Sequence, residues 1–338
     1  MTSGFERDIH AEAAALRDFD HAPYSQLLSM LLRCSYQRIV LTGMGSSHYA
    51  ALPSWRRLAA AGRPAWWIDS GQLLDSPQLI TDDTLLIATS QSGASGEIVA
   101  LLKLLDQISV SCTIIGLTND VESPLATDAD CTLQLRSGPE ATVSTKSYLN
   151  TLAAQNLVSS LLLNADSNEI GDTVELVEHL KLPAIMSQVA AEFVDARDPR
   201  LVFVGYQDHA ATAMYAGLIT KEAAKIPAEG YIGGEFRHGP LELAGPGLTA
   251  VLFGGHRAAS NSSLTRMTRD LAASGSTVVV VGGARVAGAF DVEVPEAHVD
   301  AQLSHGAVLA QWMAVALARA KGITPGAFEF GRKITRAL

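Results

Sequence analysis

The chain has 338 residues, of which 48% are hydrophobic and 18% charged, a balance typical of a folded globular protein long enough for two domains. A net charge of −10 argues against a surface for nucleic acid or for an anionic membrane. A cytoplasmic location is predicted, because three cysteines indicate no disulfide framework, no apolar segment is long enough to span a membrane, and the polar N-terminus is unlike a signal peptide.

Apolar strands that alternate with helical patterns predict parallel sheets covered by helices on both faces. In the first half the expected strands are 38–43, 64–69, 84–89, 112–118 and 131–136. A long helix is expected at 145–163. In the second half the expected elements are strands near 200–205, 249–254, 277–282 and 290–294, and a closing helix at 306–321.

The chain reads as a duplication of one α/β unit. The run Arg38-Ile-Val-Leu-Thr-Gly43 resembles Arg200-Leu-Val-Phe-Val-Gly205, and Cys112–Gly116 corresponds to Thr277–Val281 at a similar offset. The predicted organisation is an N-terminal helical segment at 1–35, a first domain at 36–165, a connecting segment at 166–197, a second domain at 198–325 and a C-terminal tail at 326–338.

A Ser/Gly turn follows the strand at 84–89 and is expected to open a helix that begins near Ser92. The unpaired N–H groups and positive dipole of a helix start suit a phosphate, and ligands of open parallel sheets bind at the carboxyl ends of strands. Four side chains add donors there: Ser90, Gln91, Ser92 and Ser95. The alternative is an ordinary helix N-cap rich in serine.

Further segments carry polar residues at predicted element ends. Gly43-Met-Gly-Ser-Ser47 is a second strand-to-helix turn, and Val143-Ser-Thr-Lys-Ser147 opens the long helix. Lys221-Glu-Ala-Ala-Lys225 and Ala228–Pro240 belong to the second half. Neither a complete G-x-G-x-x-G nor a P-loop is present, which disfavours dinucleotide and ATP sites, and no cofactor is expected.

These segments together resemble the sugar isomerase (SIS) superfamily, and above all the isomerase half of glucosamine-6-phosphate synthase and stand-alone amino-sugar-phosphate deaminases and isomerases. That group's pattern reads S-Q-S-G-x-[ST], then S-T-K, then K-E-x-x-x-x-x-A-E-x-[YF]-x-x-x-E-x-x-H-G-P. The chain matches it in order with Ser90–Ser95, Ser144–Lys146, Lys221-Glu222, Ala228–Tyr231 and Glu235–Pro240. The resemblance implies two tandem SIS domains, each a five-stranded parallel sheet between helices.

The resemblance also implies roles for individual residues. Its phosphate-binding positions fall on Ser47, Ser90, Gln91, Ser92 and Ser95, and its sugar-binding positions on Ser144 and Glu235. Glu222 matches the base that moves a proton between C1 and C2, and His238 matches the residue that opens the sugar ring. A carboxylate and a histidine suit these proton transfers near neutral pH, and no metal is needed.

Simpler interpretations exist for both residues. Glu222 could be a solvated helix charge paired with Lys225 at i+3, and His238 could be a turn residue before Gly-Pro. The chain also departs from the synthase. Thr2 replaces the cysteine of the glutaminase domain, so glutamine is not the expected ammonia source without a partner, and Ile219 stands where the family often has lysine.

The synthase tail carries a catalytic lysine. Counting from Gly322 places Lys333 at that position, and aligning on Thr335 places Arg332 there. The expected function is a metal-independent phosphosugar aldose–ketose isomerase and amino-sugar-phosphate deaminase. The alternatives are a fructosamine-phosphate deglycase and a non-catalytic phosphosugar-binding regulator. The resemblance further implies a homodimer with shared active sites, in which each His238 serves the partner chain. Nucleic-acid and membrane partners are not expected, given the net charge of −10.

Overall fold

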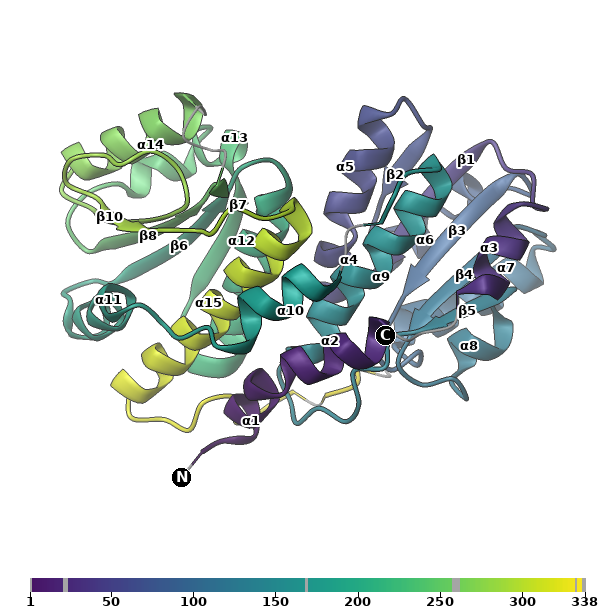
Figure 1. Cartoon of the computed structure of the whole chain (residues 1–338), viewed down its shortest axis with the longest axis horizontal. Coiled ribbons are helices and arrows are strands. Elements are labelled where there is room, and N and C mark those ends of the chain that lie inside the picture. The colour runs from purple at the N-terminus through teal and green to yellow at the C-terminus, as the bar shows by residue number, and fades with distance from the viewer. Residues whose placement is uncertain (1, 21–23, 168–169, 257–261, 332, 336–338) are drawn as a thin grey trace. The chain divides into compact units, whose positions relative to one another are not determined.

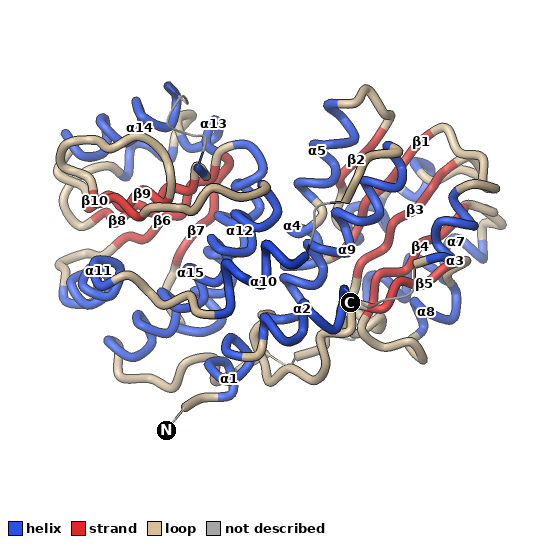
Figure 2. The backbone as a smooth tube through the Cα atoms, viewed as in Figure 1, coloured by secondary structure: helices blue, strands red, loops and turns tan. Residues whose placement is uncertain are grey.

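The computed structural model describes residues 2–20, 24–167, 170–256, 262–331 and 333–335. The backbone divides into two compact units, each built on one parallel sheet with helices around it (Figure 2). The first-sheet unit comprises Ala14–Glu140, Lys146–Ile170 and Phe330–Leu338. The second-sheet unit comprises Met1–Ala13, Ala141–Thr145 and Gly171–Glu329. The fold class predicted from the sequence, two α/β domains with five-stranded parallel sheets, is confirmed.

The first sheet has the strand order β2-β1-β3-β4-β5, and all its strands are parallel. Its strands are β1 (Arg38–Gly43), β2 (Ala65–Trp67), β3 (Thr84–Thr89), β4 (Thr113–Thr118) and β5 (Cys131–Gln134). All five lie where the apolar runs predict them, with β1 and β3 matching residue for residue. Continuous burial along β3 explains why its apolar run was so clear.

Helices cover both faces of this sheet, because successive side chains of a strand point to opposite faces. Ile39 and Leu41 pack in one core, and Val40 between them packs in the other. The first core is closed by α3 (Ser25–Leu31), α5 (Leu52–Ala60) and α9 (Lys146–Leu163). The second core is closed by α6 (Ser70–Asp75), α7 (Gly96–Gln107) and α8 (Pro124–Asp128). The short helix α4 (Gly45–Ala50) follows β1 directly (Figure 1).

The second sheet repeats the first. Its strands are β6 (Arg200–Gly205), β7 (Ala228–Ile232), β8 (Leu248–Phe253), β9 (Thr277–Val281) and β10 (Phe290–Val292). The order β10-β9-β8-β6-β7 equals that of the first sheet when β6 to β10 are matched with β1 to β5. The predicted pairing of Arg38–Gly43 with Arg200–Gly205 is therefore a pairing of equivalent strands, which confirms the duplication.

Helices also lie on both faces of the second sheet. Residues of α14 (Ser262–Ala273) pack on the face that carries Val202 and Val204. The other long helices of this unit are α11 (Ala184–Asp195), α12 (Ala210–Ala224) and α15 (Val299–Ala320). Both α11 and α12 pack against α15. The remaining α-helices of the described residues are α1 (Gly4–His10), α2 (Glu12–Asp20), which continues into the first-sheet unit, α10 (Ile170–Glu178) and the single turn α13 (Gly233–Phe236). None of the described helices is long and apolar enough to cross a membrane.

Two second-half elements differ from the sequence prediction. The closing helix α15 begins at Val299 rather than at 306, because its first turns bury polar residues such as Gln302 and His305 that hide the apolar pattern. Strand β7 was not predicted. It lies at the sheet edge, and Glu229 and Gly230 near its centre leave it without the apolar run that predicts a strand. The domain boundaries given above, 36–165 and 198–325, remain a prediction.

Gly230 explains how α12 approaches β7 so closely. A Cβ at Gly230 would lie 2.3 Å from the carbonyl oxygen of Ala213, and one at Gly217 would lie 2.7 Å from the nitrogen of Gly230. Both glycines therefore let the α12 backbone rest directly on the edge strand. This contact sets the position of the helix that carries Glu222.

Candidate functional site

Two hydroxyl-bearing turns leave the first sheet at neighbouring strand ends. β1 ends at Gly43, which pairs in register with Thr89 at the end of β3. Ser47 lies in α4 just after β1, and Ser90 directly follows β3. Because the strands are parallel, both turns emerge at the same carboxyl edge of the sheet, where open α/β sheets bind ligands.

The turn after β3, residues 90–95, is called the serine turn here. The Ser90 and Ser95 hydroxyls lie 2.8 Å apart, and the Ser92 hydroxyl accepts a hydrogen bond from the Ala94 N–H at 3.3 Å. Gly93 has a positive φ of 61°, and a Cβ there would lie 1.9 Å from the Ser123 hydroxyl oxygen. Only glycine fits this position, so the turn's shape is set by contact with the neighbouring loop.

The helix after the serine turn begins later than predicted. α7 starts at Gly96 with Ser95 as its N-cap, whereas the sequence pattern placed the start near Ser92. Residues 90–95 instead form the turn, since Gly93 is in the left-handed region and cannot continue a helix. The Ser95 side chain does not cap the helix; its hydroxyl lies within hydrogen-bonding distance of the Ser90 hydroxyl instead.

We expect the double substitution Ser92→Ala/Ser95→Ala to raise KM for a sugar phosphate by at least about 10-fold. Each lost hydroxyl removes a donor to an anion, and hydrogen bonds to charged groups contribute about 1.5–3 kcal/mol. Steady-state kinetics would measure the change. The matched control is Ser29→Ala/Ser111→Ala, which removes two exposed serines from the same unit. An unchanged KM in the turn variant would remove the serine turn from the phosphate site.

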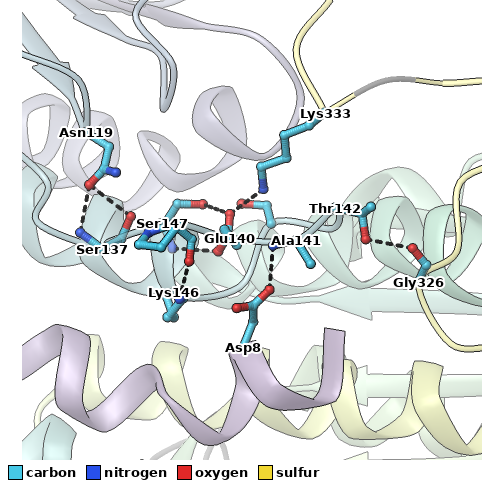
Figure 3. A network of polar contacts seen from close by, with 12 residues as sticks. Asp8, Asn119, Ser137, Glu140, Ala141, Thr142, Lys146, Ser147, Gly326 and Lys333 are labelled. Atoms are coloured by element: carbon cyan, nitrogen blue, oxygen red, sulfur yellow. Dashed lines mark hydrogen bonds and ion pairs between the residues drawn. The ribbon is translucent and has the colours of Figure 1, made fainter. Parts of the chain in front are cut away.

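The tail lysine Lys333 is held by a buried carboxylate of the same unit (Figure 3). Its ammonium lies 2.5 Å from Glu140 Oε2, and the Glu140 side chain has no solvent exposure. Ser147, near the start of α9, donates its N–H to Glu140 at 3.0 Å and its hydroxyl at 2.7 Å. Glu140 thus also satisfies one of the open N–H groups at the start of α9.

The charge of Lys333 determines the titration of Glu140. Burial by itself raises the pKa of this carboxyl, because a low-dielectric surrounding disfavours the charged form. The attraction of the Lys333 ammonium and the hydrogen bonds from Lys333 and Ser147 outweigh burial, so that the pKa of Glu140 lies below its ordinary value. Glu140 is therefore ionised at neutral pH.

A second contact joins the tail to the start of α7, directly after the serine turn. The Gly96 N–H, at the start of α7, donates to the backbone carbonyl of Thr335 at 2.9 Å. The tail therefore reaches the unit that carries the serine turn at two points, Lys333 and Thr335. The alternative tail residue, Arg332, lies outside the described residues.

Glu222 lies in the last turn of α12 and is half-buried. The helix ends at Lys225, whose φ of 53° is left-handed. The Lys225 ammonium donates to the backbone carbonyl of Glu222 and lies 5.4 Å from the centre of the Phe328 ring. The lysine is thus engaged with a main-chain oxygen and an aromatic ring.

His238 and Glu235 are exposed on the segment that follows β7. Glu235 belongs to α13, and the N–H of His238 donates to its carbonyl at 2.9 Å. Phe236 between them is fully buried and packs edge-on against Tyr231, with ring centres 5.3 Å apart. One buried aromatic therefore fixes the segment, while the acid and the imidazole face solvent.

Ser144 lies in the short stretch Ala141–Thr145, which belongs to the second-sheet unit although the stretches on both sides of it belong to the first. Its backbone carbonyl accepts a 2.6 Å hydrogen bond from the Tyr215 hydroxyl of α12. Two neighbours are held in the same unit: the Ala141 N–H donates to Asp8 at 2.7 Å, and the Thr142 hydroxyl donates to the Gly326 carbonyl at 2.6 Å (Figure 3).

The structure groups the predicted site residues by unit. The first-sheet unit holds Ser47, Ser90, Gln91, Ser92, Ser95 and Lys333, and the second-sheet unit holds Ser144, Glu222, Glu235 and His238. Sequence reasoning missed Glu140, the buried partner of Lys333. Its only sequence signal is an acidic residue shortly before a helix start. Within the described ranges, no three His, Cys, Asp or Glu side chains cluster in a way that could hold a metal ion.

Comparisons with known proteins place the chain in one family. The SIS domain model matches residues 31–160. Glutamine–fructose-6-phosphate aminotransferase (isomerizing) of Pyrococcus horikoshii is 30% identical over 257 residues, which are 72% of this chain and 42% of that protein. The chain therefore spans less than half the length of this relative.

Solved structures of similar fold cover nearly the whole chain. The C-terminal domain of glucosamine-fructose-6-phosphate aminotransferase from Francisella tularensis has a TM-score of 0.80 at 17% identity, over 95% of this chain and 97% of that one. Glucosamine-6-phosphate deaminase of Thermotoga maritima has a TM-score of 0.73 at 20% identity, over 98% and 99%. These two structures show the same fold, whereas the domain model and the relative from Pyrococcus horikoshii show the family: the chain belongs to the SIS domain family.

Proposed function

We propose that the chain is a sugar-phosphate aldose–ketose isomerase that deaminates an amino-sugar phosphate of the glucosamine 6-phosphate type. The observation that carries the proposal is the pair of hydroxyl-bearing turns at the register-matched ends of β1 and β3. A helix start with several hydroxyl donors suits a phosphate group. In this proposal Ser47 and the serine turn bind the phosphate, and Ser144 and Glu235 bind sugar hydroxyls.

The proposed reaction moves one proton between adjacent carbons. His238 delivers a proton to the ring oxygen as the bond from C1 to that oxygen breaks, while the C1 hydroxyl loses its proton and becomes the aldehyde. Glu222 takes the proton from C2 to form an enolamine and returns it to C1, which leaves an imine at C2. Water hydrolyses the imine, so that glucosamine 6-phosphate and water yield fructose 6-phosphate and ammonia. Lys333 is the proposed tail lysine of the site, and neither metal nor cofactor is required.

The experiment that tests this function incubates the chain with glucosamine 6-phosphate and measures ammonia and fructose 6-phosphate together. Equal amounts of the two products are expected. Release of an amino acid from a fructosamine phosphate, without ammonia from glucosamine 6-phosphate, would instead identify a deglycase. Binding of sugar phosphates without turnover of any of them would identify a regulator and overturn the proposal.

We further propose a homodimer in which each His238 acts at the partner chain's Glu222. The exposure of His238 on a segment outside the regular helices and strands supports this arrangement, since such a segment can reach a second chain. Mixing inactive Glu222→Gln chains with inactive His238→Asn chains should then restore activity. Random pairing of equal amounts gives about a quarter of the wild-type rate, because half of the dimers carry one intact site.

The mixing experiment is informative only if the two variants exchange subunits. Native mass spectrometry of the mixture would detect the mixed dimers. Exchange without recovered activity would contradict shared sites. Recovered activity would exclude the alternative in which Glu222 and His238 of one chain act together.

A further inference from the structure

A buried chain of hydrogen bonds ends at the backbone carbonyl of Ser144. The Tyr215 hydroxyl donates to that carbonyl at 2.6 Å. The side-chain amide of Gln311, on α15, donates to the Tyr215 hydroxyl oxygen at 2.9 Å and to the Glu12 carboxylate at 2.7 Å. Tyr215 and Gln311 have no solvent exposure, and Glu12 is 2% exposed. All four residues belong to the second-sheet unit.

The direction of each hydrogen bond in this series follows from which groups can donate and which can only accept. A carboxylate only accepts, so the Gln311 amide nitrogen must face Glu12 and gives one hydrogen to it. The second amide hydrogen goes to the Tyr215 oxygen. The single hydrogen of the Tyr215 hydroxyl is then left for the Ser144 carbonyl. Water does not compete at these buried atoms, so each bond holds its partner firmly.

Tyr215 also links Ser144 to the helix that carries Glu222. The two residues are seven positions apart on α12, which places them on one side of the helix about 10 Å apart along its axis. The carbonyl of Ser144 is therefore tied to the same rigid element as the proposed base. The N–H of Ala141 and the hydroxyl of Thr142 are tied within this unit as well.

We propose that Tyr215, supported by Gln311 and Glu12, is a positioning residue that holds Ser144 in place relative to Glu222. This inference rests on the proposed function, in which Ser144 contacts the sugar. Tyr215 then governs affinity for the sugar part of the substrate. It does not govern affinity for the phosphate, whose proposed ligands belong to the first-sheet unit.

The test is Tyr215→Phe, which removes one hydroxyl and keeps the ring. KM for the sugar phosphate should rise about 5- to 10-fold, the scale of one buried hydrogen bond, while the Kd of inorganic phosphate stays within about twofold. In a Ser144→Ala background, Tyr215→Phe should raise KM almost no further. Both substitutions act on the same interaction, the proposed contact of Ser144 with the sugar. The matched control Tyr206→Phe loses a hydroxyl bond to the Ser263 carbonyl in the same unit and should leave KM unchanged.

A second measurement does not depend on turnover. Amide hydrogen exchange of the peptide 141–147 should become faster in Tyr215→Phe and stay at the wild-type rate in Tyr206→Phe. Unchanged exchange together with unchanged KM would overturn the positioning role and leave the proposed function intact. Faster exchange in a chain that turns over no sugar phosphate would overturn the proposed function alone. Equal loss of phosphate and sugar affinity would show a general structural role and contradict the inference.

Discussion

Replacing Glu222 by glutamine is expected to lower kcat at least about 100-fold while the substrate still binds. Glutamine keeps the size and the hydrogen-bonding shape of the side chain, but it cannot take a proton from carbon. The loss of a general base usually costs two to four orders of magnitude in rate. Steady-state kinetics on glucosamine 6-phosphate, with binding measured separately by calorimetry, would record both parts of this result.

The matched control for this variant is Glu192→Gln, which neutralises an exposed carboxylate on α11 of the same unit. It should leave kcat and KM unchanged. A folded Glu222→Gln chain with near wild-type turnover would show that Glu222 is a helix surface charge and that the proton is moved by another group.

Removing the ammonium of Lys333 is expected to destabilise the chain by about 3 kcal/mol at neutral pH. In Lys333→Met the Glu140 carboxylate keeps its hydrogen bonds from Ser147 but loses its ion pair. Breaking a buried ion pair costs about 3–5 kcal/mol of unfolding free energy. The hydrogen bonds that Ser147 still donates to Glu140 place the expected loss at the lower end of this range. For a chain of 338 residues that unfolds as one unit, the midpoint of thermal unfolding should fall by about 4 °C.

The destabilisation should depend on pH in a defined direction. In the wild type the pKa of Glu140 is lowered, so its contribution to stability is present above the ordinary value of 4.5 and is lost as pH falls below it. In Lys333→Met burial raises the pKa of Glu140, and protonation on acidification then relieves the buried charge. The difference between the two proteins should therefore be largest near neutrality and should shrink below about pH 4.5.

Urea unfolding of both proteins across this pH range would measure the difference. Lys103→Met, which removes an exposed lysine of α7, serves as the control and should unfold like the wild type. Equal stability of Lys333→Met and wild type at neutral pH would contradict the described pair between Lys333 and Glu140.

Much of the fold could be predicted because the central strands are apolar along their whole length. β1, β3 and β6 are buried from their second residue at the latest, so nothing interrupts their pattern. β7 could not be found in this way, since an edge strand with Glu229 and Gly230 at its centre lacks an apolar run. The start of α7 was misplaced because Gly93 and its contact with Ser123 depend on a loop 30 residues away.

The candidate site likewise has a part that could be predicted from the sequence and a part that could not. The serine turn was recognisable because its residues are contiguous and follow an apolar strand. Glu140 and Tyr215 were not, because what makes each of them significant is a partner far along the chain. Lys333 is 193 positions from Glu140, and Ser144 is 71 positions from Tyr215. Patterns within a short stretch of sequence cannot predict contacts between residues so far apart; only a resemblance to a known family can point to them.

Solvent deuterium exchange tests the proposed proton transfer most directly. With glucosamine 6-phosphate in D₂O, the wild-type chain should place deuterium at C1 of the fructose 6-phosphate formed, since a carboxylate base trades its proton with solvent in part of the turnovers. Glu222→Gln should incorporate none above the uncatalysed rate, although it still binds the substrate. Exchange by Glu222→Gln as fast as by the wild type, or no exchange by the wild type, would contradict Glu222-mediated isomerisation of a sugar phosphate.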